Sequence, residues 1–459
     1  MNLRNLKFAG SFFPKDPVAL HDLLDSFDTE LSHKNAVTQT PPIAIIAPHA
    51  GYQFSGKLAA AAYASCGPQR PERIVILSPS HRCRFDGIAV AGYQAYDVAG
   101  QVLPLDEDLR RDLVSRGWVR HRDAAHEDEH GIDTQLPFIN RHFKGARVLP
   151  LVIGNTTPKA VAAVIDQIMS QVQEKLLFVL SRDLSHFHDR DAAQKLDAQA
   201  AGLIETGQFD GLGPTLACGH LAIAGFLASA AGQATRVLRL AMSDSFAVTQ
   251  DAKRVVGYGA WAFFPTECEI LSPIHRETLL RVARQGTGMF LNAGRKPHIM
   301  LNSFAAPLQG YMPCFITLTH NDRLRGCIGS LAACAPLISD AVANGIKAAT
   351  GDPRFTPLKT GQQLAQLRMK VAVLSRAAAL EFNDQDDLLS QITPGISGLI
   401  LQCGKRRGTF LPMVWDSLPE RKSFLDALKV KAGLTTDFWS EDIKVLQFHA
   451  ESFADPPKA

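Results

Sequence analysis

Short apolar runs, some of them separated by stretches with helical periodicity, shape the first half of the chain. Each run has the length and the continuous apolar character of a buried strand. Stretches rich in alanine and leucine at 55–64 and 159–172 indicate helices between some of them. This alternation predicts an α/β fold with a mainly parallel sheet. The predicted strands lie at 43–47, 74–77, 148–153 and 176–180.

The second half has a different pattern. Residues 313–318 lead to a turn at 320–322, and residues 324–329 return from it, which is typical of a β-hairpin. Residues 337–350 have the pattern of a helix, and 369–374 that of a strand. This part is predicted to be α+β.

The boundary between the two halves falls where both pattern and composition change. Eleven of the 15 histidines precede residue 269, and a strand-like run at 261–265 ends at Pro265. A helical pattern begins after Pro273. A chain of 459 residues also exceeds what one ordinary core holds. We therefore expect two domains, at 1–268 and 269–459.

Composition narrows the class of protein. The hydrophobic fraction is 46% and the charged fraction 20%, with a net charge of +3, which fits globular domains without a dense basic face for nucleic acid. The N-terminal residues lack the apolar core of a signal peptide, and no apolar stretch has the length of a membrane span. A cytoplasmic protein without nucleic-acid or membrane partners is expected. The eight cysteines form no CxxC pair, which argues against a zinc ribbon or an iron–sulfur site.

Three of the predicted strands are followed by side chains that can bind metals. His49 follows the first strand, His81 the second, and Asp183 and His186 follow the strand at 176–180. Ligands of open α/β sheets bind at the carboxyl ends of the strands. The sequence therefore predicts that these side chains meet in one cleft.

Cys218 adds a thiol to this set. It precedes an apolar helical stretch at 221–229, where the helix dipole would lower the pKa of a thiol. Imidazole and thiolate favour Zn, Fe or Cu, and two histidines with one anionic ligand are typical of an open redox-iron site. We interpret His49, His81 and Cys218 as metal ligands, and Asp183 and His186 as groups that support them or act in acid–base catalysis. The alternative for each residue is a structural histidine or a small buried cysteine.

At these residues the sequence resembles the Memo family, over roughly residues 5–265. The matching motifs are AGSFFP at 9–14, PHAGY at 48–52 with Ser55 and Gly56, SPSH at 78–81, EDEH at 127–130, SRDLSH at 181–186, and Cys218 with Gly219. The resemblance implies a fold similar to that of the LigB-like class III non-haem iron dioxygenases. His49 and His81 then match metal ligands, and His186 matches the catalytic histidine. Cys218 stands where those enzymes carry a carboxylate, which favours Fe(II) or Cu in a different redox role.

The second half carries the motifs LRGCIGS at 324–330, DPRF at 352–355, GTFLP at 408–412 with Val414 and Trp415, Phe424 with Leu425, and KAGL at 431–434. With these motifs it resembles the AMMECR1 family, over about residues 272–452. The family is associated with Memo-like and radical-SAM proteins in a three-part system, so the resemblance implies a radical-SAM partner. Cys327 lies between Gly326 and Gly329 in the hairpin and is interpreted either as a catalytic nucleophile or redox thiol, or as a buried strand cysteine. Arg354 is a candidate anion contact.

Three functional hypotheses follow from these residues. The first is a redox metalloprotein that uses Fe or Cu on an unknown small molecule or peptide. The second is a non-enzymatic binding or scaffold module that uses the old dioxygenase pocket and docks a radical-SAM partner. The third is thiol chemistry at Cys218 or Cys327 without a metal.

Overall fold

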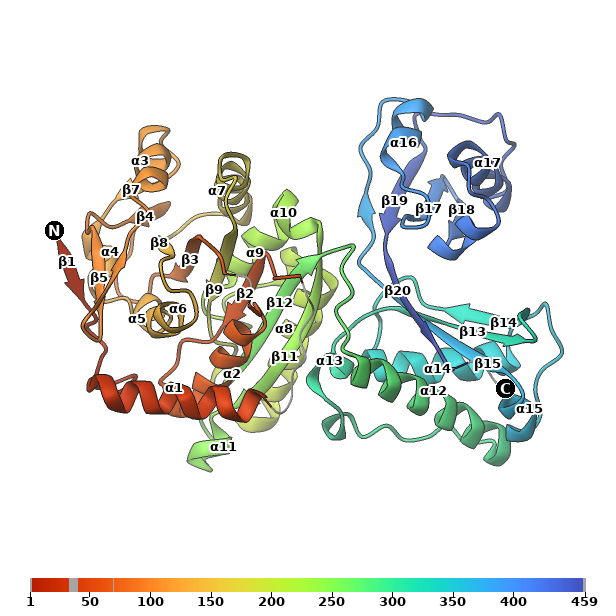
Figure 1. The fold of residues 1–459 in the computed structure, drawn as a ribbon, viewed down its shortest axis with the longest axis horizontal. Helices are drawn as coiled ribbons and strands as arrows, with labels where there is room; N and C mark the ends of the chain where they lie inside the picture. The colour runs from red at the N-terminus through yellow and green to blue at the C-terminus, as the bar shows by residue number, and fades with distance from the viewer. Residues whose placement is uncertain (1, 33–39, 69, 457–459) are drawn as a thin grey trace. The chain divides into compact units, whose positions relative to one another are not determined.

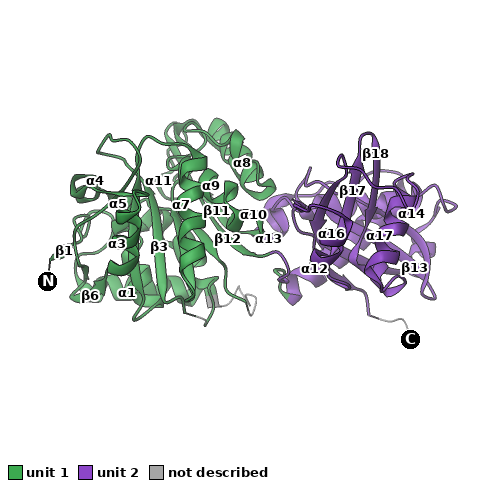
Figure 2. Cartoon of the chain, turned by 90° about the horizontal axis from the view of Figure 1, so that it is seen from above, with its two compact units in different colours: residues 1–265, 270–272 green, residues 266–269, 273–459 purple. Residues whose placement is uncertain are grey.

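The chain folds into two compact units that follow one another in sequence. The structure, a computed structural model, describes residues 2–32, 40–68 and 70–456 (Figure 1). Unit 1 consists of residues 1–265 with 270–272, and unit 2 of residues 266–269 with 273–459 (Figure 2).

The centre of unit 1 is a block of four parallel strands that match the four apolar runs. In sheet order they are β2 (Ala44–Ala47), β9 (Leu176–Ser181), β3 (Arg73–Pro79) and β8 (Arg147–Ile153). Each neighbouring pair is parallel, and the strands are mostly buried, as expected for a sheet covered on both faces. The carboxyl ends of β2, β9 and β3 consequently lie side by side at one edge.

The sheet as a whole is mixed, so the expectation of a mainly parallel sheet holds only for its centre. On one side, β12 (Val255–Pro265) runs antiparallel to β2, to β11 (Thr235–Asp244) and to β10 (His186–His188). On the other side, β4 (Ile88–Val90) runs antiparallel to β8, and β7 (Arg120–His121) is parallel to β4. The parallel block is therefore flanked by antiparallel strands.

Helices cover the sheet and supply the rest of its core. The predicted helices are confirmed as α2 (Tyr52–Ala64) and α7 (Pro158–Gln171), and apolar residues of α7, α8 (Arg190–Thr206) and α9 (His220–Ala228) share one core with the central strands. The start of α7 is fixed by Thr157, whose hydroxyl accepts a hydrogen bond from the third helical amide at 3.2 Å. Among the described residues, none of the helices combines the length and apolar character needed to cross a membrane.

A buried histidine of unit 1 makes its stability depend on pH. His126, on α4 (Asp123–Glu127), is fully buried, and burial lowers its pKa from 6.5 to about 4. In the unfolded chain the imidazole takes up a proton near pH 6.5, whereas in the folded chain it does so only near pH 4. The contribution of His126 to stability is therefore complete above pH 6.5 and is lost as the pH falls from 6.5 to 4. Lowering the pH from about 7 to about 5 is expected to remove about 2 kcal/mol through this group.

His126→Gln is expected to lose that part of the pH dependence, because glutamine does not titrate. The free energy of unfolding of unit 1, measured in urea at the two pH values, tests this. His121→Gln, at an exposed position of β7, is the matched control. An acid-induced loss that is equal in wild type and His126→Gln would contradict the assignment.

Unit 2 contains the predicted hairpin within its first sheet. That antiparallel sheet has the order β14 (Arg323–Gly329), β13 (Cys314–His320), β15 (Arg368–Leu374) and β20 (Ala450–Ala454). The strands β13 and β14 join through Asn321 at φ 48° and Asp322 at φ 60°. Positive φ at both turn residues suits a tight hairpin, and asparagine and aspartate tolerate it.

A second antiparallel sheet of unit 2 forms a separate lobe. Its order is β16 (Ala378–Ala379), β19 (Lys444–Phe448), β17 (Gly398–Cys403) and β18 (Arg406–Phe410). The helix α17 (Arg421–Lys431) packs on this sheet through a core of its own.

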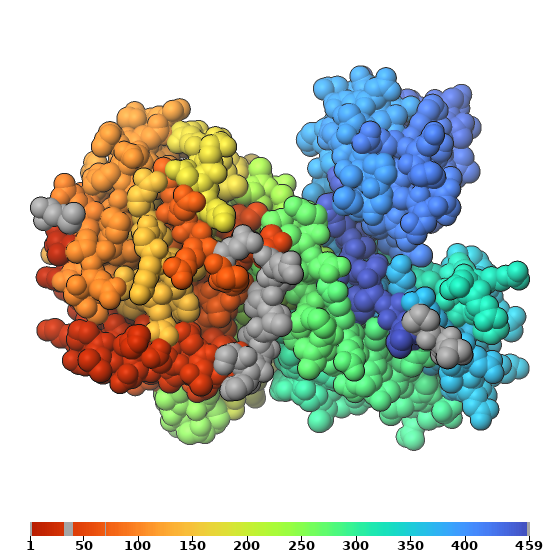
Figure 3. Space-filling view, in the orientation of Figure 1, coloured from red at the N-terminus to blue at the C-terminus, as the bar shows by residue number. Residues whose placement is uncertain are grey.

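A small apolar core joins the two lobes of unit 2. It brings Ala372 and Leu374 of the first sheet together with Ile400 and Phe448 of the second. In the space-filling view the lobes form two swellings, with the dark blue end of the chain passing between them and a notch in the surface where they meet (Figure 3).

Candidate metal centre

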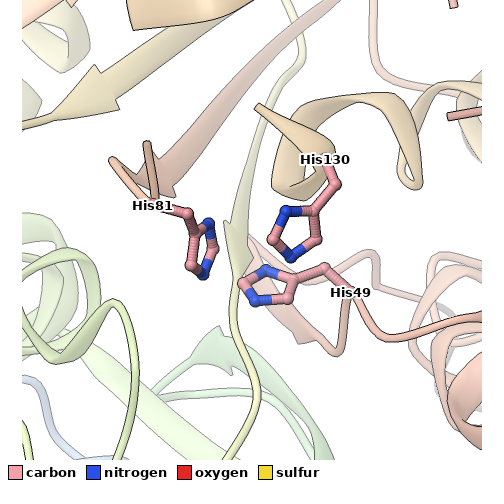
Figure 4. A group of neighbouring side chains, drawn as sticks. All are labelled: His49, His81 and His130. Carbon is pink, nitrogen blue, oxygen red and sulfur yellow. The ribbon is translucent and has the colours of Figure 1, made fainter. Parts of the chain in front are cut away.

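Three histidines converge at the carboxyl edge of the unit 1 sheet. The imidazoles of His49, His81 and His130 each offer a ring nitrogen, and these nitrogens lie within 4.8 Å of one another. The ring centroids are 4.9 Å apart for His49 and His81 and 4.2 Å apart for His81 and His130. Figure 4 shows the three rings turned toward a common space. That separation suits one metal ion bound by all three.

His49 is fixed in orientation from both its backbone and its ring. Its amide donates to Asp183 Oδ1 at 2.9 Å, and its Nδ1 lies 3.0 Å from Ser181 Oγ. Ser181 ends β9, the neighbour of β2 in the sheet, and Asp183 follows it by two residues. The Nε2 atom of His49 is thereby left for a ligand, an arrangement typical of metal-binding histidines.

His81 is held by a buried carboxylate. Its Nδ1 lies 2.7 Å from Glu129 Oε1, and its amide donates to Glu129 Oε2 at 2.9 Å. Glu129 itself is 1% exposed, and although burial raises its pKa, the hydrogen bond and charge of His81 bring it below the usual value. The negative carboxylate makes the imidazole a better donor through its other nitrogen.

Cys218 brings sulfur to the same place. Its Sγ lies 3.3 Å from His49 Nε2, the ring nitrogen that faces the site. The amide of Asp183 donates to the same Sγ at 3.2 Å. Gly219, with φ 62°, turns the chain from Cys218 into α9, so the thiol sits beside the imidazole rather than on the helix. The three histidines His49, His81 and His130 form the cluster, and the Cys218 sulfur lies beside it through its contact with His49.

Burial keeps His49 and His130 neutral. It lowers the pKa of His130 from 6.5 to about 4 and that of His49 well below 6.5, and the charge of neighbouring histidines lowers both further. Neutral imidazole is the form that binds a metal.

The expectation that the pKa of the Cys218 thiol is lowered is wrong. Burial, followed by the negative charge of Asp183, raises the pKa of the thiol to about 12. These effects outweigh the amide hydrogen bond and the positive charge of Arg182, both of which favour the thiolate. A metal-free nucleophile at Cys218 is therefore disfavoured, whereas a metal cation would bind the sulfur with release of the proton.

The other predicted residues lie around the cluster or in unit 2. Burial raises the pKa of Asp183 to about 6, and its Oδ2 is 3.9 Å from His49 Nε2. His186 lies on β10 with its Nδ1 bonded to the Leu184 carbonyl at 2.9 Å, near enough for its charge to lower the pKa of His49. Cys327 belongs to β14 of unit 2.

His130 and Glu129 are the site residues to which the sequence reasoning gave no role. Both stand at the start of the short helix α5 (His130–Asp133), not at the end of a strand. The signal was present in the motif EDEHG, whose glycine is sterically required. A Cβ on Gly131 would lie 2.3 Å from Ser78 Oγ and 3.1 Å from His49 Nδ1.

A cavity of about 610 Å³ is lined by residues next in sequence to two of the site residues. Its lining includes Ser80, next to His81, and Gly219, next to Cys218. Arg84, Asn155 and His220 add polar groups, which is the mixture of surfaces that small-molecule sites present.

Comparison with known proteins places both halves of the chain. Residues 4–262 match the family of Memo-like proteins, and residues 280–453 match AMMECR1. A MEMO1 family protein of Methanopyrus kandleri, MK0963, is 30% identical over 286 residues, which cover 57% of this chain and 98% of that protein. A second protein of the same organism, MK0488, is 34% identical over 187 residues, or 39% of this chain and 87% of that protein. The crystal structure of the uncharacterized protein PH0010 from Pyrococcus horikoshii aligns with 39% of this chain and 91% of that chain, at 32% identity and a TM-score of 0.37.

The mixed α/β fold with a histidine cluster at its sheet edge is that of a Memo-like protein, and the chain belongs to the Memo family. Its second half is an AMMECR1 domain fused to the Memo domain.

Proposed function

We propose that unit 1 is a redox metalloprotein that binds Fe(II) or Cu, related to the LigB-like non-haem dioxygenases. The observation that carries this is the convergence of His49, His81 and His130 within 4.8 Å, with the Cys218 sulfur 3.3 Å from His49 Nε2. Imidazole and thiolate ligands favour Fe, Cu or Zn over Mg or Ca.

The residues present fit such a metal. The Nδ1 atoms of His49 and His81 are engaged by Ser181 and Glu129, and the Nε2 atom of His49 faces the Cys218 sulfur. The Nδ1 of His130 is buried and has no hydrogen-bond partner among the described residues. The neutral imidazoles of His49 and His130 and the protonated Cys218 thiol form a site in which a bound cation offsets the cost of burying polar groups.

A bound Fe or Cu would supply one-electron chemistry, and the side chains around it would transfer protons and bind the substrate. Asp183 sits 3.9 Å from His49 Nε2, and its raised pKa of about 6 suits proton transfer near neutral pH. The partly buried His186 can serve as a second proton carrier. The cavity beside Ser80 and Gly219 would hold the substrate, a small molecule or a peptide.

The third component in this proposal is a radical-SAM protein, with which Memo-like and AMMECR1 proteins are associated. The second candidate function, a binding module, is favoured by the cavity of about 610 Å³. The two functions differ in their need for the thiol. A binding module would keep its partner in a Cys218→Ala variant, whereas a partner that recognises the metallated site would be lost.

Cobalt(II) tests the proposed thiolate ligand without oxidising it. The wild-type protein is expected to show a near-ultraviolet sulfur-to-cobalt charge-transfer band, and Cys218→Ser is expected to lose that band while cobalt still binds through imidazole. Cys83→Ser, a cysteine in the lining of the neighbouring cavity, should keep it. Identical spectra for wild type and Cys218→Ser would remove sulfur from the ligand set.

A further inference from the structure

Three cationic side chains of unit 2 lie near the strand that carries Cys327, and none of them belongs to the proposed metal centre. They come from three segments: Arg325 from β14, Arg354 from the loop after α14 (Leu337–Thr350), and Lys431 from the end of α17. The first two belong to one lobe and the third to the other.

A buried carboxylate fixes the position of Arg354 beside Cys327. The carboxylate of Asp352, whose side chain is 2% exposed, accepts Arg354 Nε at 2.9 Å and Nη2 at 2.7 Å. The same carboxylate accepts the amide of Cys327 at 2.8 Å. The guanidinium also reaches the Cys327 carbonyl at 3.4 Å, while the Cys327 Sγ lies 3.3 Å from Thr317 Oγ1. One buried group thus positions both the cation and the thiol-bearing strand.

Aromatic rings hold these cations at the surface. The guanidinium carbons of Arg325 and Arg354 lie 5.8 Å and 5.4 Å from the centre of the Phe355 ring. Lys431 Nζ lies 4.8 Å from the centre of the Phe410 ring on β18 and donates to the Thr409 carbonyl at 2.7 Å. These contacts limit the motion of the cations without neutralising them.

Close packing of α17 on β18 sets the place of Lys431. A Cβ on Gly408 would lie 2.8 Å from the Leu428 carbonyl oxygen, so glycine is needed for the helix to approach. Partial burial lowers the pKa of Lys431, and the positive charge of Arg354 lowers it further while the Cys327 thiol acts in the opposite sense. The ammonium is therefore within electrostatic reach of both.

Positive charge is in excess at this place. Within the described part of the chain, Arg325 and Lys431 have no carboxylate partner, and Asp352 offsets Arg354 alone. Like charges held together are unfavourable unless an anion joins them. Guanidinium and ammonium groups on separate segments are the donors with which proteins bind phosphate and carboxylate groups.

We propose that Arg325, Arg354 and Lys431 form a recognition site for the oxyanion group of a small molecule, phosphate or carboxylate, which places that molecule against the Cys327 thiol. The site belongs to the AMMECR1 domain and does not depend on a metal in unit 1.

Alkylation with a charged and a neutral reagent of equal chemistry tests this site. Iodoacetate and iodoacetamide both transfer their methylene carbon to the thiolate sulfur, with loss of iodide, but only iodoacetate carries a carboxylate. The measured quantity is the rate of labelling by iodoacetate divided by the rate of labelling by iodoacetamide, obtained by mass spectrometry of the full chain. At low salt this ratio is expected to be about tenfold higher at Cys327 than at the exposed Cys334. High salt should remove most of the difference.

Variants of Lys431 test whether the cationic side chains cause the preference for iodoacetate. Lys431→Gln is expected to lower it about threefold and Lys431→Arg to preserve it, because only the first removes the charge. Lys422→Gln, on the same helix but paired with Asp426, is the matched control and should change nothing. An equal ratio at Cys327 and Cys334, a ratio unaffected by Lys431→Gln, or a Cys327 that neither reagent labels would overturn the proposal.

Competing anions distinguish the two ligand classes at matched ionic strength. Slower iodoacetate labelling of Cys327 in inorganic phosphate than in acetate supports a phosphate ligand, and the reverse order supports a carboxylate. If iodoacetate labels Cys327 at the same rate in phosphate, in acetate and in chloride, oxyanion recognition is overturned.

Discussion

Replacing His81 with alanine is expected to lower the affinity of the Memo domain for Fe(II) or Cu by about 100-fold, because one of the converging donors is removed. His49→Ala is expected to have a similar effect. His81 is the better test, since its side chain is 23% exposed and its loss leaves the core intact. Dissociation constants measured anaerobically by competition with a chelator give the result.

Two controls separate loss of a ligand from general damage. Glu129→Gln keeps the ligand but replaces the carboxylate that bonds His81 Nδ1, so a smaller loss of about tenfold is expected. His121→Ala removes an exposed histidine of β7 and should leave the affinity unchanged. Equal affinities in wild type and His81→Ala would exclude His81 from the site.

Replacing Glu205 with alanine is expected to destabilise unit 1 by about 3–5 kcal/mol. Glu205 on α8 is buried, and its carboxylate accepts Arg239 Nε at 2.7 Å and Nη2 at 2.9 Å, together with the Trp261 indole at 2.8 Å. Its removal leaves a nearly buried guanidinium and an indole N–H without this acceptor. The free energy of unfolding of unit 1 in urea gives the size of the effect.

The double variant Glu205→Leu with Arg239→Met is the control for this interaction. It removes both charges at once, so it is expected to be more stable than Glu205→Ala, because no uncompensated guanidinium remains. A double variant less stable than the single one, or a Glu205→Ala loss below about 1 kcal/mol, would show that the ion pair is not what ties α8 to the sheet.

The sequence is most informative where a residue's position follows directly from a strand. The apolar runs locate β2, β3, β8 and β9, and the rule that ligands gather at strand ends predicts that His49, His81 and Asp183 lie close together, as they do. The antiparallel strand β11 was missed because Arg236 and Arg239 interrupt its apolar pattern. Without β11 and the full length of β12, the sheet looked more parallel than it is.

Two features of the site, the role of His130 and the pKa of Cys218, depend on three-dimensional contacts that a local sequence pattern does not contain. His130 reaches the cluster from a four-residue helix, where no periodicity marks a functional position. The position of Cys218 before a helix suggested a lowered pKa, yet burial and Asp183 raise it, and neither burial nor a neighbour 35 residues away can be read from a local pattern.

The most direct test of the central claim is the metal content of the anaerobically purified wild-type chain. A redox metalloprotein is expected to hold close to one Fe or Cu per chain, bound at the cluster of His49, His81 and His130 beside the Cys218 sulfur. A wild-type chain that remains metal-free after reconstitution with Fe(II) and with Cu would contradict the assignment of unit 1 as a metal centre.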